Sequence, residues 1–213
     1  MNETHSLPRR RILQASIASL GLAIVTRPSF AHASIGWPSI DGASPFDAPI
    51  IAAARAGLER AGSNVEHRDV VGVADFSQHS RLPRLHLVDM TSGRVQTLLV
   101  AHGRGSDPEH TGWLSRFSNA PGSDATSEGA FVTSGYYIGA HGPSMRLIGL
   151  DPTNSNAESR AIVVHAAWYV GPEMIQTHGM LGRSEGCFAV SAIDLPTMLT
   201  RLGPGHLLVA GRI

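Results

Sequence analysis

Several features that would identify a class of protein are scarce in this sequence of 213 residues. Basic and acidic residues are equal in number, 17 of each, so nothing indicates a nucleic-acid partner or an anionic membrane surface. There is a single cysteine, which excludes a disulfide within the chain. Aromatic residues make up only 6%, but hydrophobic residues make up 42%, which is enough for the core of one soluble domain.

Metal-ligand patterns are also missing. The sequence has eleven histidines and no lysine, yet the histidines are scattered, without an HExxH motif or the paired spacing that metal sites use. We interpret most of them as surface or packing residues. We therefore expect no metal and no other cofactor.

The first 33 residues are typical of an export signal rather than of a folded domain. Arg9 and Arg10 are followed by a variable residue and two apolar ones, which is the twin-arginine pattern. An apolar run at residues 15–25 follows, and small residues offer a cleavage site before Ser34. A membrane anchor is the alternative, but the run is shorter than the ~20 residues of a typical span. The mature chain is expected in the periplasm or cell envelope, without stable membrane insertion.

The rest of the chain predicts many short strands and two short helices. Helices are expected at residues 44–62 and 192–202, the first capped by Asp47 and covering an open face of the sheet. Strands are expected where short apolar runs lie between turn residues. They are residues 70–76, 85–88, 95–100, 130–133, 136–138, 145–150, 160–166 and 207–209. This pattern predicts a mainly β fold, either a sandwich or a barrel.

Two long connections join these elements. Residues 103–128 contain glycines and prolines together with Trp113 and Phe117, and a long loop with its own aromatic residues is more often functional than filler. Residues 171–186 form a glycine-rich loop that leads to Cys187. No internal repeat and no domain linker is evident.

The strongest candidate site pairs Cys187 with His165. His165 closes the apolar run 161–164, so it is expected at the end of a buried strand. Cys187 follows Gly186 at a turn before another apolar run, although a free cysteine is often only a small buried hydrophobe. A neighbouring imidazole commonly generates the reactive thiolate, so a reactive thiol should have a pKa well below about 8.5. His178 is the alternative base, but a strand end holds a side chain better than a loop does.

The sequence around these residues resembles the cysteine motif of the YkuD-type L,D-transpeptidases, in the branch described as the murein L,D-transpeptidase catalytic domain family. The motif is Ser184-Glu185-Gly186-Cys187, with a histidine upstream at a strand end. The resemblance covers roughly residues 85–213, and residues 34–84 would supply a helix and a first strand that pack on this domain. Further matching positions are residues 103–106, 117–119, 127–129, 141–142, 149–150 and 182–184, with Tyr137, Asn156 and Arg160.

The resemblance implies chemistry on peptidoglycan stem peptides. In that family the cysteine attacks an amide bond next to a D-centre and is acylated, and an amine or water then takes the acyl group. Cys187 would be the nucleophile and His165 the base, with the carbonyl of Ala166 orienting the imidazole. The backbone N–H groups of Gly186 and Cys187 would form the oxyanion hole, because a glycine lets the substrate carbonyl approach closely.

Other polar residues near these motifs are candidates for substrate binding. Arg183 is a candidate for binding a substrate carboxylate, against the alternative of a solvated loop charge. His141 is expected to line the cleft or to pack, and Tyr137 to donate its hydroxyl or to lie in the core. Ser184 and His178 complete the set of candidates.

Two departures from the family pattern leave the substrate preference open. The better-known branch usually has histidine where Glu185 stands, and arginine or asparagine shortly after the cysteine, where this chain has Phe188 and Ala189. The expected function is that of an exported cysteine L,D-transpeptidase. The alternatives are an L,D-carboxypeptidase or endopeptidase on the same scaffold, or a non-catalytic cell-wall binding domain.

Overall fold

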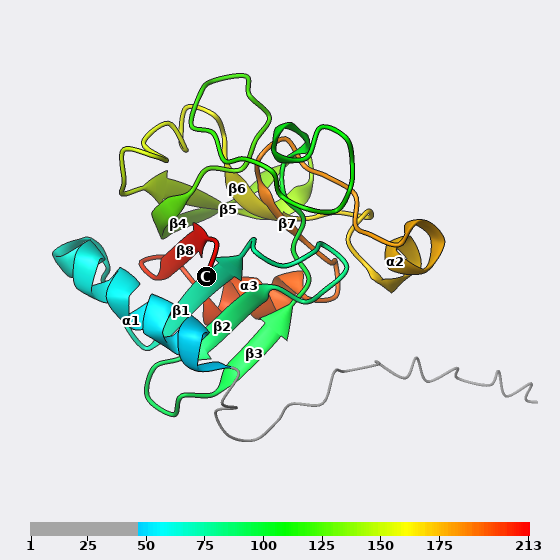
Figure 1. The fold of residues 1–213 in the computed structure, drawn as a ribbon. Coiled ribbons are helices and arrows are strands. Elements are labelled where there is room, and N and C mark those ends of the chain that lie inside the picture. Colours follow the sequence, from blue (N-terminus) through cyan, green and yellow to red (C-terminus); the bar gives the residue numbers. More distant parts are fainter. Residues whose placement is uncertain (1–46) are drawn as a thin grey trace, which may run out of the picture. The chain divides into compact units, whose positions relative to one another are not determined.

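The computed structural model describes residues 47–213, which fold around one eight-stranded sheet (Figure 1). The predicted export signal lies outside the described residues. The order of strands across the sheet is β3-β2-β1-β8-β4-β5-β6-β7. The predicted mainly β fold is therefore confirmed. The strands are β1 (Val70–Asp75), β2 (Leu85–Asp89), β3 (Val95–Leu98), β4 (Gly129–Gly139), β5 (Gly142–Gly149), β6 (Val163–Ala166), β7 (Phe188–Val190) and β8 (Leu207–Gly211).

The two ends of the sheet meet. Just after β3, Ala101 forms an isolated antiparallel bridge with Ala189 of β7, and its N–H donates to the Ala189 carbonyl at 2.9 Å. Side chains from both ends of the sheet also belong to one buried cluster, for example Leu87 of β2 and Phe188 of β7. The sheet therefore curls around a core in the manner of a barrel, which leaves few free edges.

β1 is an interior strand, which lies between β2 and β8 and is buried along its whole length. The segment before residue 85 thus supplies a strand that is paired on both sides. β2 and β3 form the predicted hairpin, with an antiparallel register that pairs Leu87 with Gln96. At its turn the Asp89 carboxylate accepts the N–H groups of Thr91 and Ser92, at 3.1 and 2.8 Å.

Two of the expected strands differ from those observed. Residues 130–133 and 136–138 belong to a single strand, β4, because a bulge between Thr133 and Tyr136 absorbs the irregularity that the sequence suggested was a break. The strand expected at 160–166 begins only at Val163. The preceding residues are held in turns, since the Ile162 N–H donates to the Ala157 carbonyl at 2.9 Å.

Within the described residues, three α-helices accompany the sheet: α1 (Ala48–Ala61), α2 (Pro172–His178) and α3 (Leu195–Arg201). α1 covers one face of β1 and β8, as expected, although Asp47 makes no side-chain cap hydrogen bond. α2 is a correction to the sequence prediction, because it lies in the stretch expected to be loop. It has seven residues, none of them buried, between Gly171 and a left-handed Gly179, so it had no apolar face to indicate it. None of the helices in residues 47–213 is long and apolar enough to cross a membrane.

Side-chain alternation divides the sheet into an inner and an outer face. Met145 of β5, Val164 of β6 and Phe188 of β7 belong to the central core cluster. Their neighbours along each strand point to the opposite face, because successive residues of a strand alternate. His165 and, by the same alternation, Cys187 therefore lie on the outer face, away from the part of this face that α1 covers around β1 and β8.

Candidate active site

Cys187 ends a tight turn immediately before β7. The hydroxyl of Ser184, which is buried, donates to the Cys187 carbonyl at 2.7 Å and accepts the Gly186 N–H at 3.1 Å. Gly186 has a φ of 113°, a conformation that favours glycine, and a side chain there would meet the Ala125 carbonyl at 2.7 Å. Ser184, expected to bind substrate, thus holds the turn that presents the thiol.

The long connection 103–128 supports this turn from one side. Two backbone hydrogen bonds pair Ser184 with the start of this connection. The Ser184 N–H donates at 2.9 Å to the carbonyl of His102, the residue just before it, and the Arg104 N–H donates to the Ser184 carbonyl at 2.8 Å. A Cβ at Gly103 would lie 2.8 Å from the Gly186 Cα, so the two glycines allow the chains to approach closely. The connection expected to be functional is therefore part of the site.

Arg160 holds the same region from another direction. Its guanidinium donates to the carbonyls of Ala125 and Ser118, at 2.5 and 2.8 Å, and to the Ser127 hydroxyl at 2.6 Å. Its positive charge also favours the ionised form of Cys187. Arg160 matched the family pattern in the sequence, but its position beside the thiol follows only from the fold.

His165 lies in β6 with a fixed ring. It is 2% exposed, and its Nδ1 lies 2.9 Å from the Ala166 carbonyl. A carbonyl only accepts, so Nδ1 carries the proton and Nε2 is left as an acceptor. The ring of His141, from the β4–β5 hairpin, stacks on His165 with ring centroids 4.3 Å apart. The structure therefore brings two of the predicted site residues, His141 and Ala166, into contact with His165.

His165 and the thiol are close in the sheet but do not share a hydrogen bond. β6 and β7 are parallel, with His165 opposite Ala189, so Cys187 is level with Val163. Adjacent strands are ~4.8 Å apart, which places His165 and Cys187 on neighbouring strands of one face. The thiol donates to the Ala161 carbonyl, with the sulfur 3.5 Å from the oxygen, and the Val163 N–H donates to the sulfur.

The surroundings of Cys187 and His165 favour the neutral form of both side chains. Burial raises the pKa of the Cys187 thiol and Glu185 raises it further, while the Val163 N–H and Arg160 oppose this. Burial lowers the pKa of His165, against the Ala166 carbonyl, and His141 lowers it further. The expectation of a depressed thiol pKa is therefore wrong for this structure, because desolvation outweighs the cation and the backbone donor. At neutral pH the site holds a thiol beside a neutral imidazole.

The remaining substrate-binding candidates are dispersed. The Arg183 guanidinium donates to the carbonyls of Asp107 and Pro108, so it holds the long connection. His178 is exposed at the end of α2, and its side chain makes no hydrogen bond, ion pair or ring contact with any described residue. Tyr137 lies on β4 with the Arg146 guanidinium 4.3 Å above its ring.

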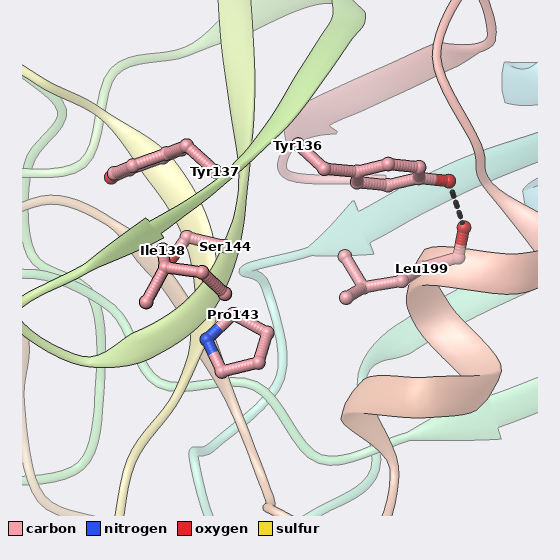
Figure 2. Close-up of a pocket in the computed structure, with 6 residues that line it drawn as sticks. All are labelled: Tyr136, Tyr137, Ile138, Pro143, Ser144 and Leu199. Carbon is pink, nitrogen blue, oxygen red and sulfur yellow. Dashed lines mark hydrogen bonds between the residues drawn. The ribbon is translucent and has the colours of Figure 1, made fainter.

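A pocket of about 260 Å³ lies between the β4–β5 hairpin and α3 (Figure 2). On its α3 side, the Tyr136 hydroxyl donates to the Leu199 carbonyl at 2.7 Å. On its sheet side are Tyr137 and Ser144, and Ser144 is the residue that pairs with His165 across the sheet. Its full lining is Tyr136, Tyr137, Ile138, Pro143, Ser144 and Leu199.

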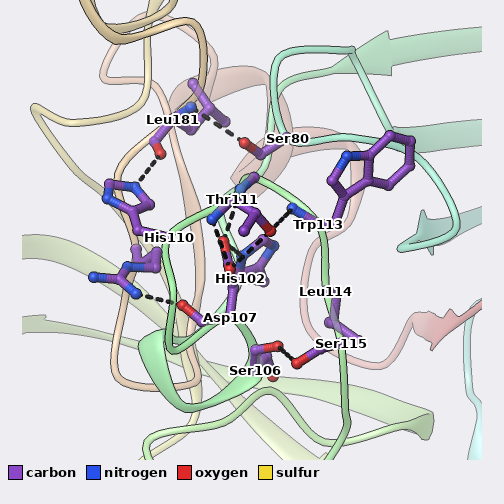
Figure 3. A network of polar contacts seen from close by, with 12 residues as sticks. Ser80, His102, Ser106, Asp107, His110, Thr111, Trp113, Leu114, Ser115 and Leu181 are labelled. Carbon is purple, nitrogen blue, oxygen red and sulfur yellow. Dashed lines mark hydrogen bonds and ion pairs between the residues drawn. The ribbon is translucent and has the colours of Figure 1, made fainter.

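A buried polar network behind the cysteine turn was not predicted. Figure 3 shows His102 and Asp107 within it, and Arg84 donates to His102 Nδ1 at 2.7 Å. The same region holds the segment that leads to Cys187, since the Leu181 N–H donates to the Ser80 hydroxyl at 3.2 Å. Nothing in the sequence distinguishes these polar residues from exposed ones. Within residues 47–213, no group of His, Cys, Asp and Glu is arranged to hold a metal ion.

The fold and site together define a class: a mainly β domain with a thiol and an imidazole on the outer face of a curled sheet. Residues 44–210 match the family described as the L,D-transpeptidase catalytic domain. The chain belongs to this family, whose members act on peptidoglycan.

Solved structures of the same kind are distant relatives. An L,D-transpeptidase from Mycobacterium smegmatis is 15% identical, with a TM-score of 0.41 over 67% of this chain and 58% of its own. An L,D-transpeptidase from Mycobacterium tuberculosis is 18% identical, with a TM-score of 0.43 over 67% of this chain and 57% of its own. The chain thus spans less than two thirds of the length of either structure. No curated protein matches the chain.

Proposed function

We propose that the chain is a cysteine acyl-transfer enzyme that acts on peptidoglycan stem peptides, with Cys187 as nucleophile and His165 as base. Membership of the L,D-transpeptidase catalytic domain family supports the substrate class. The observation that carries the mechanism is the position of the two side chains on adjacent strands of one face, with the His165 tautomer set by the Ala166 carbonyl.

The proposed reaction starts from a neutral thiol. His165 Nε2 takes the thiol proton as the sulfur attacks the substrate carbonyl, because the raised thiol pKa leaves little preformed thiolate. The imidazolium then gives this proton to the leaving amine as the C–N bond breaks, and a thioester on Cys187 remains. An acceptor amine attacks the thioester, loses a proton to His165, and the sulfur leaves as the thiol.

The proposed oxyanion hole has fewer free N–H donors than the sequence suggested. The Gly186 N–H already donates to the Ser184 hydroxyl at 3.1 Å, so it is not a free donor for the substrate. The Cys187 N–H is our remaining candidate. A single strong donor next to the nucleophile, together with the positive charge of Arg160, would stabilise the developing oxyanion.

The proposed base also sets the pH dependence of the reaction. His165 must be neutral to accept the proton, and burial lowers the pKa at which it becomes charged. Activity should therefore persist below the ordinary histidine pKa of about 6.5 and decline as His165 becomes protonated. The acid limb of the kcat/KM profile measures this, and a limb centred above pH 6.5 would contradict it.

The proposed location is the cell envelope, reached by the twin-arginine route. The motif at Arg9 and Arg10 motivates it. N-terminal sequencing of the exported protein should begin near Ser34. Export that survives replacement of both arginines by lysine would exclude this route.

The test of the function is incubation with purified muropeptides, followed by mass analysis of the products. Transfer predicts a cross-linked or exchanged peptide, and hydrolysis predicts a shortened one. The matched control is Cys187→Ala, which replaces a small residue with a small residue and should form neither product. Turnover by that variant equal to the wild type would exclude Cys187 as the nucleophile.

A further inference from the structure

Arg146 lies on the same face of the sheet as the proposed catalytic pair. Its neighbour Met145 belongs to the inner core, so Arg146 points outward by alternation along β5. In the register of β5 with β6, Arg146 is level with Val163, which is itself level with Cys187, the residue just before β7. One row across three strands therefore connects the Arg146 position with the thiol.

Tyr137 holds the Arg146 side chain in place. It stands opposite Ser144 in the register of β4 with β5, on the same outer face. The Arg146 guanidinium lies 4.3 Å from the centroid of its ring, within the range of a favourable cation–π contact. Figure 2 shows Tyr137 and Ser144 beside each other on the hairpin. The stacking orders the guanidinium without using its N–H donors.

The other arginines near the site are already bonded to groups of the protein. Arg104 pairs with Asp124 and Glu185, and the Arg160 and Arg183 guanidiniums donate to backbone carbonyls. Arg146 is exposed and forms no ion pair within residues 47–213. An ordered, solvent-facing guanidinium with free donors is suited to a planar anion, which a carboxylate fits with two parallel hydrogen bonds.

We propose that Arg146, held by Tyr137, binds a carboxylate of the substrate peptide. This inference rests on the proposed function and assigns the carboxylate role that the sequence had given to Arg183. Two to three strand spacings separate β7 from the guanidinium above Tyr137, which is ~10–14 Å. An extended peptide rises ~3.3 Å per residue, so the carboxylate lies about three or four residues from the bond that Cys187 attacks. Arg146 thus selects a carboxylate along the stem, not one next to the reacting carbonyl.

The test measures binding without turnover, in the full chain carrying Cys187→Ala. Two synthetic stem peptides are compared, identical except that the carboxylate three or four residues from the reacting bond is free in one and amidated in the other. The free acid is expected to bind about tenfold more tightly, the value of one charge-assisted pair. Adding Arg146→Gln should remove the preference and leave the affinity for the amide unchanged. Arg55→Gln, at an exposed position of α1, is the matched control and should keep the preference.

Two variants of Tyr137 test whether its ring orders the Arg146 side chain or whether a change there only disturbs the structure. Tyr137→Phe keeps the ring and should retain the acid preference, whereas Tyr137→Leu should weaken it. A preference that survives Arg146→Gln, or that is absent from the parent, overturns the inference. Normal turnover of muropeptides with an equal KM for acid and amide would sink this inference alone. An Arg146-dependent preference in a protein without turnover would instead support it while the proposed function fails.

Discussion

Two groups of ionisable residues contact the Cys187 turn, and they differ in exposure. Arg84, His102 and Asp107 are 0%, 1% and 2% exposed. The second group is on the surface: the side chains of Arg104, Asp124 and Glu185 are 56%, 34% and 70% exposed. His102 and Arg104 each form a backbone hydrogen bond with Ser184, and Glu185 is the next residue. Both groups can therefore influence Cys187. We expect the buried group to affect mainly the stability of the fold around the site, and the exposed group to affect mainly the pKa of the thiol.

The buried group forms a chain of hydrogen bonds, of which Figure 3 shows the members His102 and Asp107. Arg84 donates to His102 Nδ1, so His102 carries its proton on Nε2, which lies 3.3 Å from the Asp107 carboxylate. Burial lowers the pKa of His102 to about 3, with Arg84 adding to the effect, so it is a neutral bridge between two ions. Burial lowers the pKa of Arg84 to about 9, which leaves it cationic at neutral pH.

The exposed group is an ordinary surface cluster. Arg104 lies 2.8 Å from Asp124 and 3.2 Å from Glu185. Exposed pairs of this kind contribute little to stability, because water and salt screen them. Their influence is expected on the thiol, since Glu185 raises the pKa of Cys187.

The largest difference in stability between the two groups is expected from removing the buried cation, Arg84. Arg84→Met leaves the buried carboxylates of Asp75 and Asp107 without the cation that faces them, and breaking a buried pair in this way typically costs about 3–5 kcal/mol. Arg104→Met is the matched surface control and should cost at most about 1 kcal/mol. Urea unfolding of the two variants makes the comparison, and equal losses would show that burial does not distinguish the two groups.

The next effect is acid sensitivity from His102. Its folded pKa of about 3 is below the unfolded value, so the unfolded chain takes up a proton that the folded chain does not. Stability is retained above pH 6.5 and falls between about pH 6.5 and 3, by up to about 1.4 kcal/mol per pH unit. His102→Gln should flatten this part of the curve of unfolding free energy against pH. An unchanged slope would mean that another group carries the acid response.

A smaller effect is expected from the turn itself. Ser184→Ala removes a hydroxyl that bonds both the Gly186 N–H and the Cys187 carbonyl, and losing such buried bonds costs about 1–3 kcal/mol. Thiol alkylation and turnover should both change, because the turn sets the direction of the sulfur. Ser159→Ala, whose exposed hydroxyl bonds only the Asn156 carbonyl, should change neither. Unaltered rates of alkylation and turnover in Ser184→Ala would show that Gly186 holds the turn without the Ser184 hydroxyl.

The smallest effect is expected from the exposed carboxylate. Glu185→Gln removes a negative charge that raises the pKa of Cys187, so the thiol pKa should fall. The rate of alkylation against pH measures this, and the difference from wild type should shrink as salt is added. Glu158→Gln is the surface control. An unchanged or raised thiol pKa would show that Glu185 has no electrostatic access to the sulfur.

The elements that the sequence predicted well are those with strong local signals. β1, the β2–β3 hairpin and β8 follow from apolar runs bounded by turn residues, and α1 follows from one apolar face. The bulge in β4 and the short α2 were missed because neither leaves a local pattern. The Gly186-Cys187 turn was visible because a glycine before a lone cysteine is distinctive.

Only part of the site could be predicted from the sequence, for a related reason. His165, Ala166 and His141 were candidates, and the fold brings them together. Arg84 could not be identified, because an arginine in the sequence is expected at the surface and only the tertiary fold buries it. The thiol pKa also depends on tertiary burial, which no local motif encodes.

The central claim is that Cys187 becomes acylated with His165 as base, and intact-protein mass spectrometry tests it most directly. A stem-peptide donor should add one acyl group per chain, located on Cys187, with none on Cys187→Ala. His165→Ala should slow this acylation by roughly 10²–10⁴-fold, the usual contribution of a positioned base, whereas His178→Ala should leave it near the wild-type rate. Full muropeptide turnover by Cys187→Ala, or acylation at another residue, would contradict the account.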